Sequence, residues 1–375
     1  MISSVCRGRR LGALALLALC LACAAPGRGP AAPGGSPATA GAGQAAAPTA
    51  PANPPAVASA PPQRTTVRVG TVPGAISNAG RFVAIERGYF REEGIDFDDV
   101  AFDTSAKMLP ALAAGQIELG IGGISAGLFN AVAQGIPLRI VLDSTSAYPG
   151  DSAGGLLVRK ELIDSGAVRE IADLRGRTVA ITSKGQGTEI AMSRALAQGG
   201  LSLGDVEVAE LAYPDMTLAL GNGNVDAAIS IEPFAVQAVS RGFAVMFRDW
   251  GSLIPNDHMA VVMYSQAFAN TDAALRYAKA YVRGIRDYEA ARTQGKDREA
   301  IIAILMQYSA LKDRALYDQM HWLPLNPDGR VNGETFVAAQ DWFADHGYVR
   351  TKINLDEIID QRFADYAVAQ LGPYR

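Results

Sequence analysis

Two segments of the chain repeat one pattern, and this repeat constrains the fold more than any other feature of the sequence. Residues 108–121 align without a gap with residues 216–229, and both follow the pattern M-x-x-A-L-x-x-G-x-[IV]-[DE]-x-x-I. Each copy reads as an amphipathic helix closed by a left-handed glycine, Gly115 or Gly223, and followed by a buried strand. Chance similarity is the alternative, because helix-glycine-strand segments are common in α/β proteins. A true repeat predicts two similar lobes in series.

The hydrophobic pattern around the repeat alternates between strands and helices. The first series has predicted strands at 65–72, 95–102, 117–122 and 138–143, and predicted helices at 80–89, 106–114 and 125–134. The second series has predicted strands at 155–159, 177–182, 206–211 and 225–230, and predicted helices at 188–198, 216–221 and 233–240. Because helices of about ten residues separate the strands, each lobe should be α/β, with a mainly parallel sheet flanked by helices.

The rest of the chain predicts how the two lobes are joined. An apolar strand at 259–264 has no partner nearby in the sequence, so we expect it to return to the first sheet. The chain is then expected to be helical at 272–293, 298–308, 333–344 and 355–370. It would cross between the lobes near residues 148–150 and again near Pro255, which makes a double hinge. These crossings predict lobe one at 65–149 plus 258–375 and lobe two at 150–257.

The N-terminus predicts export. Three arginines precede an apolar stretch at 11–21, which is too short to span a bilayer and is typical of a secretory signal. The run Cys20-Leu21-Ala22-Cys23 is similar to a bacterial lipobox, although Cys20 stands where leucine is usual. We therefore expect residues 1–23 to be a lipoprotein-type signal peptide with Cys23 as the lipid anchor. Simple cleavage just after Cys23, without lipidation, is the alternative.

Composition narrows the function of the remaining chain. Residues 24–64 are mostly Ala, Pro, Gly, Ser and Thr, which predicts a disordered tether. A formal net charge of -4 leaves no basic excess to neutralise phosphates, so nucleic acid is not an expected partner. No cysteine follows Cys23, so the exported domain has no internal disulfide, thiol nucleophile or thiolate zinc site.

Four stretches of the sequence resemble one family of binding proteins. They are ERGYFREEGID at 86–96, AGQIELG at 114–120, DLRGRTVA at 173–180, and Val225-Asp226 followed by Glu232-Pro233-Phe234. In order and spacing they are similar to stretches of the nitrate/sulfonate/taurine-type (NitT/TauT) substrate-binding proteins of ABC importers. The resemblance runs from about Thr66 to the C-terminal helices, and it implies a two-lobed type II periplasmic binding protein fold. It does not choose the ligand, because related proteins bind nitrate, sulfonates, aromatic acids, bicarbonate and thiamin precursors.

Candidate ligand-binding residues follow the strands, because ligands of parallel α/β sheets bind beyond the carboxyl ends of the strands. In lobe one, Ser77 and Asn78 follow the first strand, where they either present a helix N-terminus to a polar ligand group or only cap the helix. Gly123 and Ser125 follow the third strand, where the glycine either lets a ligand approach the backbone or permits a tight turn. Asp103 follows the second strand and is a further candidate.

Lobe two offers a second set of candidates. Ser183, Gly187 and Thr188 follow a strand and open a helix, and they form either a nest for an anion or polar group or a plain turn. The segment is not a dinucleotide fingerprint, because the third glycine is absent. Glu232 either contacts the ligand or the hinge, or complements a helix dipole. Tyr213 either stacks on a planar ligand or belongs to the core.

The histidines do not form a catalytic constellation. His258, His321 and His346 are far apart in the sequence and have no metal-ligand spacing or nucleophile motif beside them. His258 lies near the second crossing, and it either reaches the hinge or is a satisfied surface residue. Some enzymes of pyrimidine synthesis in the wider superfamily carry a cysteine-rich motif, which this chain lacks.

Together these features predict a monomeric solute-binding component of an ABC importer. It would capture a small organic or inorganic ligand, anionic or polar aromatic, by hinge closure, and present it to a membrane permease and its ATPase. We expect a membrane-anchored lipoprotein in the periplasm or at the cell surface, with no catalytic residue, cofactor or metal. An exported α/β enzyme that uses the same cleft and a ligand-sensing module are the alternatives.

Overall fold

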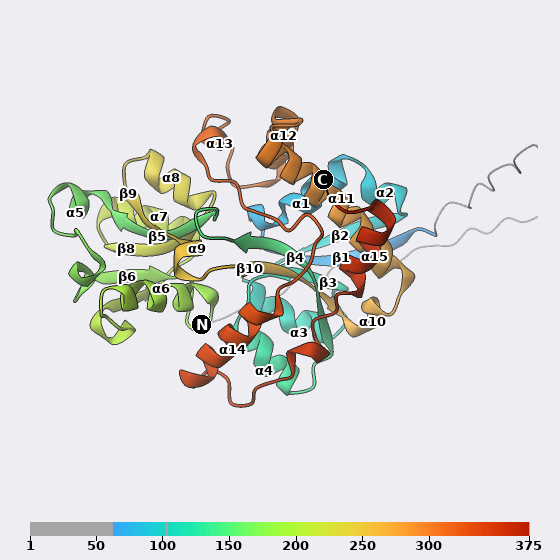
Figure 1. The fold of residues 1–375 in the computed structure, drawn as a ribbon, viewed down its shortest axis with the longest axis horizontal. Helices are drawn as coiled ribbons and strands as arrows, with labels where there is room; N and C mark the ends of the chain where they lie inside the picture. Colours follow the sequence, from blue (N-terminus) through green and yellow to red (C-terminus); the bar gives the residue numbers. More distant parts are fainter. Residues whose placement is uncertain (1–62, 103, 375) are drawn as a thin grey trace, which may run out of the picture. The chain divides into compact units, whose positions relative to one another are not determined.

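The computed structural model describes residues 63–102 and 104–374. The expected signal peptide, Cys23, most of the expected tether and Asp103 lie outside these residues. Figure 1 shows two sheets, each with helices on both of its faces, and both sheets belong to the same compact unit. In the described part of the chain, no helix is both long enough and apolar enough to cross a membrane.

The first sheet has the strand order β2-β1-β3-β10-β4. β1 pairs in parallel with β2 and β3, whereas β10 lies antiparallel between β3 and β4. Val262 in β10 stands opposite Ile121 on one side and Leu142 on the other, so the predicted return strand enters the interior of the sheet. The strands are β1 (Thr65–Thr71), β2 (Ile95–Ala101), β3 (Leu119–Gly122), β4 (Leu138–Ala147) and β10 (Asp257–Ser265).

The second sheet has the order β7-β6-β8-β5-β9. β6 pairs in parallel with β7 and β8, and β5 lies antiparallel between β8 and β9. Four strands of each sheet therefore point the same way, as predicted, and the fifth is the strand by which the chain enters from the other sheet. The strands are β5 (Gly154–Arg159), β6 (Thr178–Ile181), β7 (Glu207–Glu210), β8 (Ala227–Ile231) and β9 (Ala244–Asp249).

The sequence repeat is a structural repeat. β3 lies between β1 and the antiparallel β10, and β8 occupies the matching place between β6 and the antiparallel β5. The glycines before these strands, Gly115 and Gly223, have φ values of 65° and 80°, which is the left-handed conformation predicted for them. The acidic position of the pattern also has one role in both copies. Glu118 accepts the backbone N–H of Arg68, and Asp226 accepts that of Thr178.

Helices connect the strands within each sheet and form the C-terminal part of the chain. The first sheet is joined by η1 (Ile76–Asn78), α1 (Ala79–Glu86), α2 (Tyr89–Glu92), η2 (Ser105–Lys107), α3 (Met108–Ala113) and α4 (Ala126–Ala133). The second has α5 (Lys160–Asp164), η3 (Ile171–Leu174), α6 (Gly187–Gln198), η4 (Leu203–Asp205), α7 (Tyr213–Asn222), α8 (Phe234–Ser240) and α9 (Trp250–Leu253). The C-terminal part has α10 (Gln266–Ala269), α11 (Asp272–Gln294), α12 (Arg298–Tyr308), α13 (Leu316–Gln319), α14 (Gly333–Asp345), η5 (Leu355–Glu357) and α15 (Arg362–Leu371).

Two segments depart clearly from the predicted secondary structure. The edge strand β9 was not predicted, although a short apolar run lies there between the charged residues Arg241 and Arg248. The single helix expected at 355–370 is instead a short turn and α15, because residues 358–360 extend along β4. The N–H of Ile140 donates to the carbonyl of Ile358 at 2.7 Å, and the N–H of Asp360 donates to the carbonyl of Ile140 at 2.9 Å.

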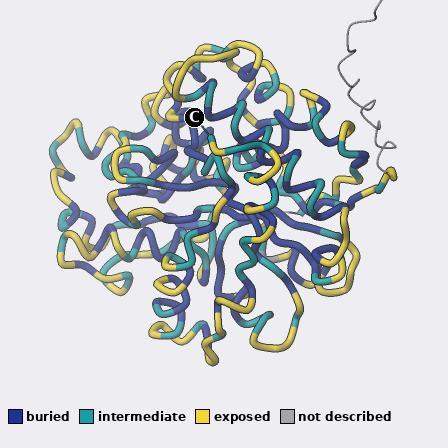
Figure 2. Tube along the Cα trace, turned by 45° about the vertical axis from the view of Figure 1, so that its right-hand side comes forward, coloured by how far each residue is buried: buried dark blue, intermediate teal, exposed yellow. Residues whose placement is uncertain are grey.

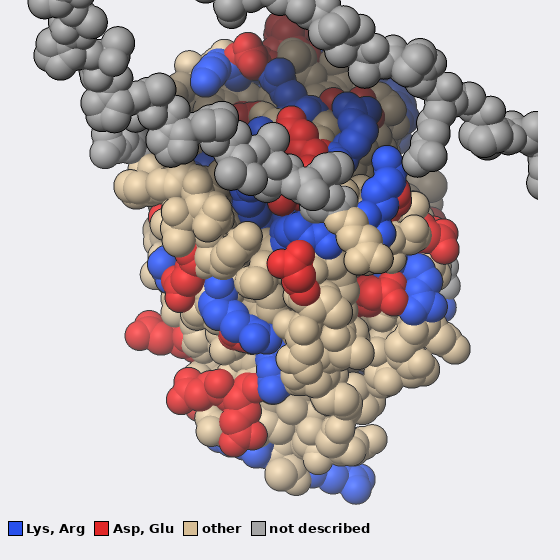
Figure 3. Space-filling view, turned by 90° about the vertical axis from the view of Figure 1, so that its right-hand side faces the viewer, with Lys and Arg blue, Asp and Glu red and all other residues tan. Residues whose placement is uncertain are grey.

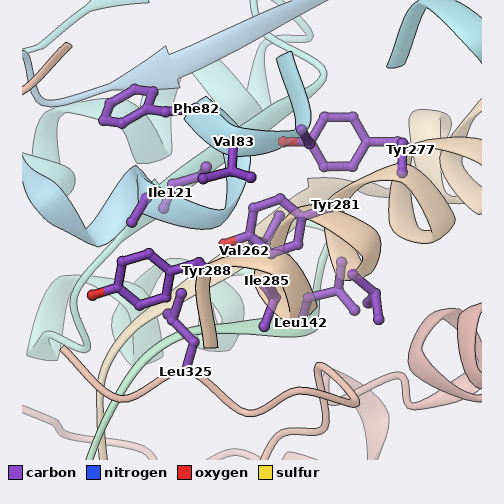
Figure 4. Packing of buried hydrophobic residues seen from close by; sticks show 14 of the residues in the cluster. Phe82, Val83, Ile121, Leu142, Val262, Tyr277, Tyr281, Ile285, Tyr288 and Leu325 are labelled. Carbon is purple, nitrogen blue, oxygen red and sulfur yellow. The ribbon is translucent and has the colours of Figure 1, made fainter. Parts of the chain in front are cut away.

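Helix α11 is the centre of the core beneath the first sheet. Tyr277, Tyr281, Ile285 and Tyr288 recur at helical spacing and are fully buried, which places them on one face of α11. Figure 4 shows these side chains gathered with Val83 of α1 and with residues of the sheet. Figure 2 shows that burial is concentrated in the strands and the inner faces of the helices, while exposed residues lie in the outer loops.

Charged side chains on the surface are mixed in sign. Figure 3 shows one face on which basic and acidic residues alternate, without a field of one sign. Many are paired, as Lys279 is with Glu93 at 2.6 Å and Arg87 is with Asp297 at 2.8 Å.

Gly115→Ala tests the conformational basis of the repeat. A Cβ at this position would meet no atom within 4 Å, so the substitution adds backbone strain without a steric clash. We expect the free energy of unfolding to fall by about 1–2 kcal/mol, measured by urea denaturation. Gly127→Ala is the matched control, since Gly127 is in α4 and a Cβ there would make ordinary contacts, the nearest at 3.6 Å to Ser125 Oγ. We expect it to stabilise the protein by about 0.5–1 kcal/mol, and changes of the same sign in both variants would contradict the assignment.

Candidate functional site

A cavity of about 450 Å³ lies between the two sheets, beyond the carboxyl ends of β3 and β6. The half of the molecule built around the first sheet contributes the loop after β3, the start of β10 and one face of α14. The half built around the second sheet contributes the loop after β6, helix α6, Tyr213 and helix α9. The lining residues are Gly123, Ile124, Thr182, Gln186, Gly187, Thr188, Ile190, Arg194, Tyr213, Trp250, Leu253, Ile254, Pro255, Asn256, Asp257, His258, Met259, Asn332, Glu334, Thr335, Ala338 and Ala339.

The loops after β3 and β6 touch each other across the boundary between the sheets. The N–H of Ala126 donates to the carbonyl of Gly185 at 2.9 Å, and Ser125 and Gln186 form an isolated antiparallel bridge. Beside this contact, the hydroxyl of Tyr348 donates to Oε1 of Glu189 on α6 at 2.8 Å. These contacts connect the two halves at the cavity, which is a closed arrangement.

The N-terminus of α6 opens into the cavity. Its first amides have no intrahelical acceptor, and the side chain of the N-cap residue Gln186 does not cap them. Thr188 is not a free donor in this arrangement, because its Oγ1 accepts the N–H of Thr182 and pairs with the hydroxyl of Thr182 at 2.6 Å. At Gly187 a Cβ would have its nearest neighbour only at 3.9 Å, in the ring of Trp250. The N–H of Glu189 donates to the carbonyl of Gln186 at 3.0 Å. The amides of Gly187 and Thr188 and the helix dipole make this end of the cavity suited to an anionic or polar group.

The charges at the cavity are of two kinds. Arg194 on α6 and Glu334 on α14 are exposed, and their side chains have no ion pair or hydrogen bond with other described residues. Asp257 is buried and accepts the indole N–H of Trp250 at 2.9 Å, and burial raises the pKa of its carboxyl. Arg194 is therefore available to a ligand, whereas Asp257 is occupied in holding Trp250 in the wall.

His258 connects the cavity to the hinge. Its Nδ1 lies 2.7 Å from Oδ1 of Asp143 in β4, and its Nε2 accepts the backbone N–H of Asn332 at 2.6 Å. The side chain is only 4% exposed, so His258 reaches the hinge and is not a surface residue. Burial lowers the pKa of His258, but the hydrogen bond and charge of Asp143 raise it, and the net direction is upward.

Four of the residues predicted from the sequence line the cavity: Gly123, Gly187, Thr188 and Tyr213. Tyr213 also stacks on Phe234, with ring centroids 5.7 Å apart. Ser183 follows the lining residue Thr182 without lining the cavity itself. Asp103 lies outside the described residues.

The other predicted residues lie away from the cavity wall. Ser125 caps α4 by accepting the N–H of Leu128, while its backbone forms the bridge between the halves. Ser77 accepts the hydroxyl of Ser144 with its carbonyl, and Asn78 is buried with Nδ2 at 3.4 Å from the carbonyl of Ala75. Glu232 accepts the N–H of Val236 at 2.8 Å.

Sequence reasoning missed the lining residues that come from outside the loops after the strands. Trp250 follows β9, the strand that was not predicted, and Arg194 lies two turns into α6. Asn332, Glu334 and Thr335 come from the start of α14, far away in the sequence. A polar helix start, Asn332-Gly-Glu334, was the only local signal for this last group.

No group of three or more His, Cys, Asp or Glu side chains suited to a metal ion occurs within residues 63–102 and 104–374. The lining residues can bind a solute by hydrogen bonds, by the guanidinium of Arg194 and by an apolar wall. That wall contains Trp250, Leu253 and Met259.

Glu232 gives the fold a pH dependence with a defined sign. Burial raises the pKa of Glu232 from its ordinary value near 4.5 to about 7, although the N–H groups of Val236 and His321 favour the charged form. Because the folded protein retains the proton longer than the unfolded chain, stability should fall as pH rises from about 4.5 through 7. Glu232→Gln should therefore stabilise the protein at pH 8 by on the order of 3 kcal/mol, and much less at pH 4.5.

Denaturation at the two pH values measures this effect. Glu334→Gln is the matched control, because Glu334 is exposed and without a partner among the described residues. We expect it to change stability by less than about 0.5 kcal/mol at either pH. An equal effect of Glu232→Gln at both pH values would contradict the assignment.

Comparisons with known proteins agree with this architecture. The chain is 27% identical over 267 residues to the putative aliphatic sulfonates-binding protein of Escherichia coli (strain K12), covering 70% of this chain and 78% of that protein. It is 27% identical over 207 residues to the taurine-binding periplasmic protein of the same organism, covering 54% of this chain and 60% of that protein.

Solved structures share the fold. The crystal structure of the periplasmic aliphatic sulphonate binding protein of Escherichia coli superposes with a TM-score of 0.62 at 24% identity, covering 79% of this chain and 92% of that one. The desulfurization enzyme DSZB superposes with a TM-score of 0.57 at 15% identity, covering 82% and 100%. The fold is the two-lobed type II periplasmic binding protein fold. A family model described as NMT1/THI5 like matches residues 76–289, more than half of the chain, and the chain belongs to this family.

Proposed function

We propose that the protein is the extracytoplasmic solute-binding component of an ABC importer. One observation carries this proposal: loops from both lobes meet at Ala126 and Gly185 and enclose a cavity that both lobes line. A solute held there would contact both lobes only in the closed form, so it would favour closure by its differential affinity for the two forms. The named relatives, which bind sulfonates or taurine in the periplasm, support the same function.

In this proposal the lobes comprise residues 65–149 plus 258–375 and residues 150–257. The backbone rotations of closure would occur in the two crossing segments, residues 148–153 and 254–256. These segments connect the sheets without belonging to either. The closed form is then presented to a permease and its ATPase in the membrane. The protein acts as a monomer, exported to the periplasm or the cell surface.

The solute is a small molecule with an anionic or polar head and an apolar body. The head would lie at the start of α6, near Gly187 and Thr188, with the guanidinium of Arg194 on the same helix. The body would pack against Trp250 and Met259. A cavity of about 450 Å³ is within the size range of small-molecule sites and is larger than a single inorganic anion needs.

An exported enzyme is the second candidate, because the fold is shared with the enzyme DSZB. No cysteine follows Cys23, so such an enzyme could not use a thiol nucleophile. His258 and Glu232 are the titratable candidates for its catalytic groups. Turnover of a bound compound by the purified protein, lost in His258 or Glu232 variants, would favour catalysis. A sensing module would bind without turnover but would report to a receptor in place of a permease.

Arg194→Gln tests the role of the free guanidinium. A panel of taurine, an alkanesulfonate, nitrate, an aromatic carboxylate and a pyrimidine is tested by thermal shift and calorimetry. A solute at about 100 times its Kd should stabilise the protein by about 2.7 kcal/mol. For the best anion, Arg194→Gln should weaken binding by about ten- to a hundredfold, because a charge-assisted hydrogen bond is lost.

Arg350→Gln is the matched control, since Arg350 is exposed, does not line the cavity and has no partner among the described residues. It should leave the affinity unchanged. Equal losses in both variants would point to a general charge effect and contradict a contact by Arg194. Absence of any stabilisation across the panel, together with no compaction in small-angle scattering, would contradict solute capture.

Cys23→Ala tests the proposed lipid anchor. Acyl chains hold a protein at a membrane because each methylene that they bury contributes about 0.8 kcal/mol of binding free energy. The wild-type protein should therefore fractionate with membranes. The variant should appear in the soluble exported fraction or remain unprocessed. Mass spectrometry of the mature wild-type N-terminus is the direct check, and an unmodified N-terminus at Ala24 or Ala25 would contradict lipidation.

A further inference from the structure

Residues 320–332 connect α13 to α14 without forming a helix or strand, and we call this segment the strap. It passes close to the hinge. Figure 1 shows it in orange passing across β4 and β10 on its way to α14. Three hydrogen bonds join it to β4, one of them from the N–H of Asp143 to the carbonyl of Gly329 at 2.9 Å. The N–H of Ser146 donates to the carbonyl of Pro324 at 2.9 Å, and the N–H of Asn326 donates to Oδ2 of Asp143 at 2.8 Å. The strap therefore runs along the end of β4, the strand that leads into the first crossing segment.

The strap ends on His258. The backbone N–H of Asn332 points at Nε2 of the imidazole, 2.6 Å away. A backbone N–H can only donate, so Nε2 must carry a lone pair, and the ring hydrogen is on Nδ1, facing Asp143. The geometry thus requires the neutral ring in one tautomer.

Asn332 in turn fixes one wall of the cavity. It is the N-cap residue of α14, and its side chain accepts the N–H of Glu334 at 3.1 Å. Glu334, Thr335 and Ala338, on the first turns of this helix, line the cavity. The position of this wall therefore depends on a bond that only a neutral His258 can accept.

Few charges act on the ring. Asp143 in β4 is in contact with Nδ1, and Asp257 in β10 is adjacent and bonded to Trp250. In the strap, Asp328 pairs with Arg286 and Arg330 pairs with Asp365. At the cavity, Glu334 on α14 and Arg194 on α6 are exposed.

Protonation therefore exchanges one interaction for another. The carboxylates of Asp143 and Asp257 favour the imidazolium and raise the pKa of His258. The N–H of Asn332 opposes it, because an imidazolium carries hydrogen on Nε2 and repels that amide. A charged ring would bind Asp143 more strongly and lose Asn332.

We propose that His258 is a proton-sensitive positioning residue, which holds the start of α14 against the cavity when neutral and releases it when protonated. Acidification would then loosen the cavity wall and lower the affinity for solute. The effect on affinity rests on the proposed solute-binding function, whereas the release of Asn332 does not.

The release is tested first on the wild-type protein without solute. Nitrogen-15 NMR follows the protonation of His258 between about pH 9 and pH 5, and amide hydrogen exchange follows the N–H of Asn332. We expect the protection of Asn332 to fall by about tenfold, after correction for intrinsic exchange, as the ring becomes charged. Constant protection of Asn332 while His258 titrates, or a ring that does not titrate in this range, would overturn the proposal.

His258→Gln supplies the second test, because a glutamine oxygen can accept the N–H of Asn332 but cannot be protonated in this range. His346→Gln is the matched control, as His346 stacks on Trp342 and bonds its carbonyl, away from the cavity. With taurine as the probe, affinity measured by calorimetry should fall about tenfold from pH 8 to pH 5 in the wild type and in His346→Gln, but stay constant in His258→Gln.

The outcomes separate the two proposals. The same pH profile in His258→Gln and wild type would overturn the role of His258. If taurine failed to bind at every pH, the proposed solute class would lose support, and the exchange of the Asn332 amide would still decide the switch. If His258→Gln did not fold, the wild-type NMR measurement alone would decide it.

Discussion

The antiparallel strands β5 and β10 are the constraint on which the two-lobed structure depends. Each enters a sheet from the other lobe and is hydrogen-bonded on both sides, so both crossings are anchored in a sheet interior. The entry of β5 has no room for side chains. A Cβ on Gly155 would lie 2.0 Å from the carbonyl of Arg248, and one on Gly154 would lie 2.4 Å from that of Ser230. The lobe movement that we propose must therefore occur in the short segments between the sheets.

Around these crossings the protein buries polar groups in place of apolar ones. Asp143, Ser144, Thr145 and Ser146, at the end of β4, are each at most 1% exposed. Burying them is costly unless each is hydrogen-bonded, and each of their side chains has a partner: Asp143 bonds His258 and the strap, and Ser144 bonds the carbonyl of Ser77. A polar hinge of this kind has a defined geometry when it is satisfied, and it responds to a change in the charge of one member.

The fold could be predicted because its signals are local, whereas much of the site could not. Alternating periodicities and the repeated glycines placed nearly all strands, and the rule that ligands lie beyond strand ends found Gly123, Gly187, Thr188 and Tyr213. The predicted end of β4 at residue 143 was early, because its polar continuation is satisfied only by distant residues. The same limit hid Asn332 and Glu334, which reach the cavity through the strap. Ser77 and Asn78 follow a strand as predicted, but packing against the hinge keeps them from the cavity wall.

The strap and the residues before α15 determine whether a strand of another molecule can pair with the first sheet at β4. Three N–H groups of the outer strand β4, those of Ile140, Asp143 and Ser146, donate to the carbonyls of Ile358, Gly329 and Pro324. A sheet border with free amides invites pairing with a strand of a neighbouring molecule. Here the chain's own C-terminal part takes up those donors, so this border is closed to strand addition. The proposed lobe movement would not open it, because all of these groups belong to β4 and to the C-terminal part bonded to β4.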